Sequence, residues 1–274
     1  MAGRHRRPNE LAERQGLNMS VARSLSASGS ILFFVGLHQV SDACHFDRSF
    51  ISVNRLKKRV SDFLVNEWVM DSGAFSEIST FGEYRASEEE YAAQIDRWSR
   101  VGNFRAAATQ DYMCEPWIVA RTGKSVEEHQ RLTLERYDRL RSLTEQPLLP
   151  VIQGFAPEEY VAHLDAWGSR LSNGHWVAVG SVCRRNKDPE QIENILFAIK
   201  RHRPDLRLHG FGLKITALAS GAVRTMLYSA DSMAWSVAAR HQGRNANDWR
   251  EAKAFESRVQ ELASSKSLIQ GRLL

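Results

Sequence analysis

Three observations predict that this chain is an α/β protein, folded as an irregular (β/α)8 TIM barrel in a single domain. Short apolar segments alternate with longer amphipathic segments from residue 30 onward. Several of the short segments are apolar at successive positions, which is typical of parallel strands covered on both faces. Eight such segments occur in a chain of 274 residues, close to the ~250 residues of a typical barrel.

The eight expected strands follow one another along most of the chain. They are ILFFVGL (31–37), FISV (50–53), WVMD (68–71), RAAATQD (105–111), LLPVIQG (148–154), WVAVGSV (176–182), LRLHGFG (206–212) and LYSAD (227–231). FISV is the weakest of them, and its connection to WVMD is short. We therefore expect the barrel to be irregular around its second strand.

The segments between the strands carry helix signals. Ser87 with Glu90, and Ser125 with Glu128, have the spacing of capping boxes at helix starts. Prolines stand at the first helical position of two further segments. The expected helices span residues 87–98, 125–143, 156–167, 188–202 and 246–266.

Composition narrows the class of protein. Residues 1–29 are rich in Arg and Ser, which predicts a flexible basic tail before the barrel domain at 30–274. The net charge of +5 leans mildly toward polyanionic partners. No run of ~18 apolar residues and no secretory signal is found, so we expect a cytoplasmic protein without a membrane partner. Three widely spaced cysteines predict reduced thiols and no metal site.

Polar residues gather where the expected strands end. Asp71, Asp111 and Asp231 end the third, fourth and eighth strands, and Gln153, Gly180 and His209 lie at the ends of the three between. In such barrels the carboxyl ends of the strands share one rim, where the active site is built. Each residue alone is compatible with an ordinary turn, cap or core role. Together with nearby aromatic residues they predict a pocket for a flat, hydrogen-bonding heterocycle; those aromatics are Phe75, Tyr112, Phe155 and Phe211.

Sequence motifs typical of other enzyme classes are incomplete or absent. TGKS (122–125) resembles the end of a P-loop, but Ile118 occupies the position of the required glycine. GFG (210–212) is too short for a dinucleotide fingerprint, and neither GxSxG nor HExxH is present.

The ordered segments DSGAF, VIQGF, VAVGSV and LHGFG resemble those of tRNA-guanine transglycosylases, and SADSMAW lies where that family has a late-strand aspartate. With QDYMCEP and TGKSVEEHQ included, the set is more similar to the DpdA-type branch, which acts on DNA in phages and bacterial DNA-modification islands. The resemblance covers about residues 31–245.

The resemblance implies that guanine in DNA is exchanged for a 7-deazaguanine base such as preQ0 or a derivative, without a cofactor, and that the modified DNA evades restriction. By position, Asp231 would be the nucleophile and Asp71 the general acid/base. The implied base-binding residues are Asp111, Gln153, Gly180, Phe75, Ser72, Gly73, His209 and Gly210. The expected DNA phosphate contacts are Arg184, Arg185, Lys214 and Arg240, for which a solvated surface charge is an equal alternative.

One departure separates the chain from the tRNA enzymes. Their zinc subdomain needs clustered cysteines, and no cysteine follows Asp231. A tRNA substrate therefore becomes an alternative to DNA. Two further interpretations are a non-catalytic nucleic-acid-binding barrel and a hydrolytic nucleobase glycosidase. The sequence leaves the oligomeric state open.

Overall fold

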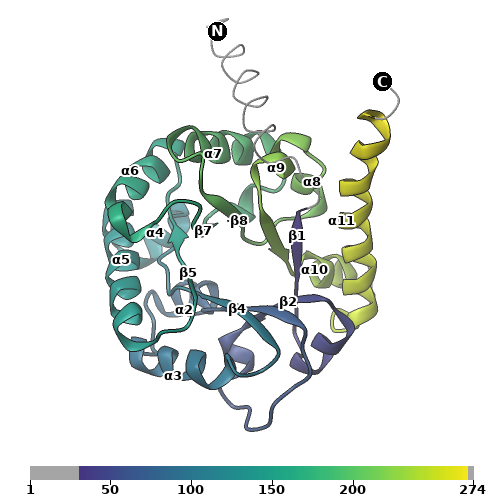
Figure 1. The fold of residues 1–274 in the computed structure, drawn as a ribbon, viewed down its shortest axis with the longest axis horizontal. Helices are drawn as coiled ribbons and strands as arrows, with labels where there is room; N and C mark the ends of the chain where they lie inside the picture. The colour runs from purple at the N-terminus through teal and green to yellow at the C-terminus, as the bar shows by residue number, and fades with distance from the viewer. Residues whose placement is uncertain (1–30, 271–274) are drawn as a thin grey trace, which may run out of the picture.

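The computed structural model describes residues 31–270 and confirms an irregular TIM barrel (Figure 1). The predicted basic tail, 1–29, lies outside the described residues. Every strand pairing is parallel, in the order β5-β4-β3-β2-β1-β9-β8-β7-β6. The strands are β1 Leu32–Gly36, β2 Arg48–Ser52, β3 Glu67–Asp71, β4 Asn103–Ala108, β5 Leu148–Leu149, β6 Val151–Ile152, β7 Trp176–Val179, β8 Arg207–Gly210 and β9 Ser229–Ser232.

The predicted fifth strand is divided at Pro150. Proline has no backbone N–H, so the ladder is interrupted there. The Leu149 carbonyl still accepts from Thr109 on the β4 side, and the Pro150 carbonyl accepts from Ala178 of β7. The chain through Pro150 thus joins both ends of the sheet and closes the ring.

Helices surround the ring, and all five predicted helices are present. Side chains of Ser87 and Ser125 make the expected capping boxes with Glu90 and Glu128. Sequence periodicity did not predict several short helices that follow strand ends. The α-helices are α2 Ala74–Phe81, α3 Glu88–Trp98, α4 Pro116–Thr122, α5 Val126–Leu143, α6 Pro157–Trp167, α7 Pro189–His202, α8 Ile215–Leu218, α9 Gly221–Met226, α10 Ala234–His241 and α11 Trp249–Gln270.

The barrel is irregular around β2, as expected. The 3-10 helices η1 (Val40–His45) and η2 (Val53–Arg55) follow β1 and β2 in place of α-helices. The outer face of β1 is covered instead by α11, at the end of the described chain (Figure 1). Phe33 of β1 meets Phe255 of α11 with ring centroids 5.9 Å apart. The last helix therefore completes the outer layer.

Strand alternation separates two apolar clusters. Trp68 and Met70 of β3 belong to the large cluster between strands and helices, while Val69 belongs to a smaller cluster that fills the lumen. Because alternate residues of a strand face opposite sides, Asp71 faces the lumen with Val69. Ser229 and Asp231 of β9 likewise flank Ala230, which belongs to the outer cluster. The lumen floor is therefore apolar and its rim carries carboxylates.

In the described part of the chain, none of the helices combines the length and the apolar character needed to span a bilayer.

Candidate active site

Asp231 lies near the end of β9 and is 7% exposed. Its Oδ1 accepts hydrogen bonds from Nε2 of His209, at 3.2 Å, and from the backbone N–H of Gly212, at 3.1 Å. Within the part of the chain that the structure describes, Oδ2 has no hydrogen-bond partner. One carboxylate oxygen is thus held in place while the other is left for chemistry.

Asp71, the last residue of β3, is partly buried at the same rim. Its pKa is raised to about 6, chiefly by burial and in smaller part by the negative charge of Asp231. Hydrogen bonds from the Ser52 side chain and the Gly73 backbone oppose this rise. A carboxyl with this pKa has both protonation states accessible near neutral pH, as a general acid/base requires.

Asp111 begins a buried chain of hydrogen bonds across the next part of the rim. The Gln153 amide nitrogen donates to Asp111, and Oε1 of Gln153 accepts from Ser181 Oγ at 2.8 Å. Ser181 Oγ is also 3.0 Å from Oε2 of Glu115. Because a carboxylate requires a donor, this network sets the orientation of the Gln153 amide. Four buried side chains, two from the segment after β4 and one each from the segments after β6 and β7, therefore form one hydrogen-bonded chain.

Burial raises the pKa of both carboxyl groups in this chain of hydrogen bonds. It raises the pKa of Asp111 to about 7, whereas the hydrogen bond from Gln153 opposes the rise. Burial also raises the pKa of Glu115. Ser181 has a single hydroxyl proton for two acceptors, so a protonated Glu115 would donate to Ser181 and let Ser181 donate to Gln153. The arrangement is suited to reading the donor–acceptor edge of a purine.

Three glycines leave space for neighbouring side chains near the rim. A Cβ on Gly180 would lie 2.2 Å from the Gln153 amide nitrogen, and one on Gly73 would lie 2.4 Å from the Asn54 side chain. Gly73 also has φ 77°, which favours glycine, at the start of α2. The Gly180 N–H donates to Ile152, so it is engaged in the sheet instead of being free to bind a base carbonyl. A Cβ on Gly210 would clash with Leu213 at 2.6 Å, so that glycine serves packing.

Two expected base contacts face elsewhere. His209 is fully buried in the lumen, stacked on Phe50 with centroids 5.5 Å apart. No face of its ring is exposed to stack on a base, although the resemblance implied that His209 binds the base. Ser72 is also buried and is hydrogen-bonded to the Tyr84 hydroxyl. Strand alternation explains Ser72, because it follows Asp71 and points to the opposite side.

An exposed aromatic cluster stands at the rim. Phe75 of α2 and Trp117 of α4 are 48% and 40% exposed, with ring centroids 6.1 Å apart. The Arg184 guanidinium carbon lies 5.6 Å from the Phe75 ring centre and 5.1 Å from that of Trp117. We call these three residues the aromatic platform. It joins Phe75 and Arg184, for which the sequence predicted separate roles.

The other predicted phosphate contacts are dispersed. Arg185 is bound to the Phe155 carbonyl at 2.6 Å and to Gln191, so it is engaged within the protein. Lys214 is exposed at the start of α8, and Arg240 is exposed on α10, where its charge acts on His38. Only Arg184 of the four belongs to the aromatic platform.

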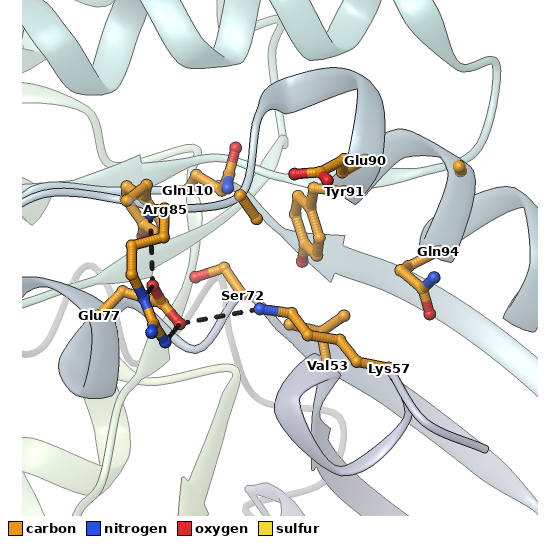
Figure 2. Close-up of a pocket in the computed structure, with 12 residues that line it drawn as sticks. Val53, Lys57, Ser72, Glu77, Arg85, Glu90, Tyr91, Gln94 and Gln110 are labelled. Atoms are coloured by element: carbon orange, nitrogen blue, oxygen red, sulfur yellow. Dashed lines mark hydrogen bonds and ion pairs between the residues drawn. The ribbon is translucent and has the colours of Figure 1, made fainter.

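A cavity of about 490 Å³ lies next to the rim, but the three rim aspartates are not among the residues that line it (Figure 2). Glu77 lies on one side of it with Lys57, 3.7 Å away, and Arg85, 3.1 Å away, and Tyr91 lies on the other side. Hydrogen bonds from Arg85 lower the pKa of Glu77, so its single negative charge offsets one of the two cations. The cavity also reaches Ser72 and therefore runs behind the end of β3.

Sequence reasoning missed several residues of the site. Ser181 is the one non-glycine residue with positive φ (55°) in the described chain, and its three hydrogen bonds hold that conformation. Glu115 and Trp117 lie in or after the QDYMCEP motif, where a buried acid next to an exposed indole was a usable signal. Ser52 and Ser229 carried no signal, because single serines in apolar segments are ordinary.

The raised pKa of Asp71 predicts a stability effect. The folded protein binds more protons than the unfolded chain between about pH 4 and pH 6, so this group makes stability fall as pH rises through that window. Asp71→Asn cannot ionise. We expect it to be more stable than wild type by about 1–2 kcal/mol at pH 8, with little difference at pH 4. Urea unfolding of both proteins at the two pH values measures this.

Asp205→Asn is the matched control, because the Arg203 hydrogen bond lowers the pKa of Asp205 to about 2. That carboxylate stabilises the fold above the unfolded pKa, so the control variant should lose stability at pH 8. Equal destabilisation by both substitutions at pH 8 would contradict the destabilising effect assigned to ionised Asp71.

Comparisons with known proteins identify the family of this chain. Among residues 31–270, no group of three or more His, Cys, Asp or Glu side chains is arranged to hold a metal ion. A search of curated proteins finds no match. The family DpdA, described as "DeoxyPurine in DNA protein A", matches residues 33–248, which span the nine described strands apart from Leu32, the first residue of β1, and include all three rim aspartates. The chain therefore belongs to the DpdA family.

Proposed function

We propose that the protein is a DNA-guanine transglycosylase, which exchanges guanine in DNA for a 7-deazaguanine base through a covalent link to Asp231. One observation carries the proposal. Asp231, with one carboxylate oxygen held and the other unpaired, shares a rim with Asp71, whose pKa is raised to about 6. A nucleophile beside a proton-carrying acid is what a retaining displacement at a sugar carbon requires.

The chemistry proceeds in two displacements. Oδ2 of Asp231 bonds to C1′ as the C1′–N9 bond breaks, and the departing guanine takes the bonding pair and a proton from Asp71. The incoming base then gives its N9 proton to Asp71, and N9 attacks C1′ and releases Asp231. Both carboxyl groups return to their starting states, and two inversions retain the configuration. The exchange balances without a further reactant.

The Asp111–Gln153–Ser181–Glu115 chain supports purine recognition. A carboxylate at Asp111 accepts from the N1–H and exocyclic amine of guanine, and the buried Gln153 amide orients that carboxylate by donating to it. A 7-deazaguanine presents the same edge, so one surface serves both the leaving and the entering base. This shared edge is what a base exchange requires.

The aromatic platform supports a DNA substrate. A base within a duplex stack cannot reach a buried carboxylate, so the target nucleotide must leave the stack. Exposed rings beside a guanidinium bind unstacked bases and phosphate. Phe75, Trp117 and Arg184 supply these groups at the strand ends.

Trp117→Ala is expected to weaken binding of single-stranded DNA by about tenfold, because base–aromatic stacking contributes ~1–3 kcal/mol per base. Fluorescence anisotropy with a labelled oligonucleotide measures this. The control is Phe81→Ala, since Phe81 is similarly exposed at the far end of α2, against Arg85. Equal losses in both variants, or none in Trp117→Ala, would remove the platform from the DNA-binding surface.

Labelled guanine tests the proposed function directly. The protein is incubated with the label and either DNA or tRNA, and incorporation into each polymer is counted. Label in DNA is expected, and unlabelled 7-deazaguanine should then chase it out. Label in tRNA alone would favour the tRNA enzyme. Guanine release without incorporation would indicate a hydrolytic glycosidase, and binding without either would indicate a binding barrel.

A further inference from the structure

A line of polar side chains runs through the apolar lumen to Asp231. Nε1 of Trp176 on β7 donates to Oγ of Ser229 on β9 at 2.8 Å. Oγ of Ser229 lies 2.9 Å from Nδ1 of His209 on β8, and Nε2 of His209 lies 3.2 Å from Oδ1 of Asp231. Ser229 and His209 are fully buried. Polar groups in such surroundings are costly unless each is paired.

The direction of each hydrogen bond follows from the chemistry of the groups. An indole N–H only donates, so Ser229 Oγ accepts from Trp176. An ionised Asp231 only accepts, so His209 must carry its proton on Nε2. In a neutral imidazole Nδ1 is then an acceptor, and the Ser229 hydroxyl proton is directed to it. Every donor and acceptor in the line is matched for one tautomer.

Packing holds the imidazole ring in this line. Phe50 stacks on His209 at 5.5 Å, and Phe211 and Trp176 meet it edge-on at 5.3 and 5.9 Å. The pairing of β8 with β9 puts His209 opposite Ser229, and Asp231 is two residues further on the same face. Backbone register and aromatic packing thus aim Nε2 at the carboxylate.

We propose that Trp176, Ser229 and His209 are positioning residues that lock Asp231 through the Nε2–H tautomer, leaving Oδ2 as the attacking oxygen. With the N–H of Gly212, His209 holds Oδ1 from two directions and fixes the plane of the carboxylate. Orientation of a nucleophile contributes strongly to rate, and a wrong imidazole tautomer removes it. The inference rests on the proposed role of Asp231 as nucleophile.

The tautomer is tested without any activity measurement. Long-range ¹H–¹⁵N NMR on histidine-labelled full-length protein distinguishes Nε2–H from Nδ1–H, and His209→Gln identifies the His209 signals by their loss. The Nε2–H pattern is expected in wild type. In Ser229→Ala the Nε2–H pattern should remain, because Asp231 still accepts from Nε2, while the Nδ1 resonance should shift with the loss of the Ser229 hydroxyl. An Nδ1–H pattern in wild type would overturn the proposed line.

Two substitutions of His209 separate positioning from packing. The Gln amide nitrogen reaches the place of Nε2 and can donate to Asp231, whereas the shorter Asn amide reaches only the place of Nδ1. We expect His209→Asn to slow guanine release in a single turnover about 100-fold or more, and His209→Gln less than about tenfold. DNA affinity should be unchanged in both. Equal losses in two folded variants would mean that the ring serves packing alone.

A second pair of substitutions changes two serines of the same strand, β9. Ser229→Ala should slow the same step about tenfold, whereas Ser232→Ala should leave it unchanged, because among residues 31–270 the side chain of buried Ser232 bonds only to the backbone of Ala234. Equal effects of the two serines would count against the line. If wild type neither releases nor exchanges guanine, the proposed function fails, and the NMR pattern still decides the tautomer.

Discussion

Asp231→Asn is expected to abolish base exchange, lowering the rate by at least ~10⁴-fold, while DNA affinity stays within about threefold of wild type. The amide keeps the size of the carboxylate and its contact with the N–H of Gly212, but it cannot form the glycosyl ester. Loss of the charge removes the nucleophile and leaves the recognition residues in place.

Two measurements on Asp231→Asn test whether Asp231 is the nucleophile. Incorporation of labelled guanine reports the full exchange, and mass spectrometry of protein incubated with DNA reports the covalent adduct, which wild type should form and the variant should lack. Asp205→Asn, which removes a carboxylate paired with Arg203, is the control and should exchange normally. If exchange survives in Asp231→Asn, another carboxylate must be the nucleophile, and Asp71 would be the first candidate.

Asp71→Asn is expected to slow base exchange by ~10²–10⁴-fold, the usual contribution of a positioned general acid/base. The asparagine keeps a hydrogen bond to Ser52 but can neither give a proton to the departing guanine nor take one from the entering base. Adduct formation should still occur slowly, because Asp231 is intact. Slow accumulation of adduct distinguishes this variant from Asp231→Asn.

The pH dependence of guanine release tests the same role. The protonated fraction of Asp71 falls about tenfold per pH unit above its pKa of about 6. The wild-type single-turnover rate of guanine release is therefore expected to fall as pH rises from 6 to 8. In the second displacement Asp71 takes a proton from the entering base, so the rate of this step should rise up to about pH 6 and then level off. Asp71→Asn should lose both dependences, and a variant that kept them would show that another group carries the proton.

Much of the fold could be read from the sequence because periodicity and caps are local signals. Apolar runs such as WVMD marked strands, and the Ser87 and Ser125 boxes marked helix starts, since both depend on neighbours a few residues away. The division at Pro150 and the packing of the predicted last helix against β1 depend on contacts between segments far apart in the chain. No local pattern records those contacts.

The candidate site divides in the same way. The rim position of Asp71 and Asp231 followed from strand ends in a parallel barrel, a rule that needs only the fold class. The interior place of His209 did not follow, because a histidine near a strand end fits both a pocket and a core. Its partners, Trp176 and Ser229, are 33 and 20 residues away, and only the register of β7, β8 and β9 brings them together.

By itself, the sequence determined the barrel and the order in which three aspartates reach one rim, because strand periodicity and strand ends are properties of short segments. The tertiary structure alone decided what each carboxylate meets. Burial and the neighbouring charge raise the pKa of Asp71, and hydrogen bonds from His209 and Gly212 hold Asp231. The physical reason is that burial, charge and hydrogen-bond direction depend on atoms that are close in space and far apart along the chain.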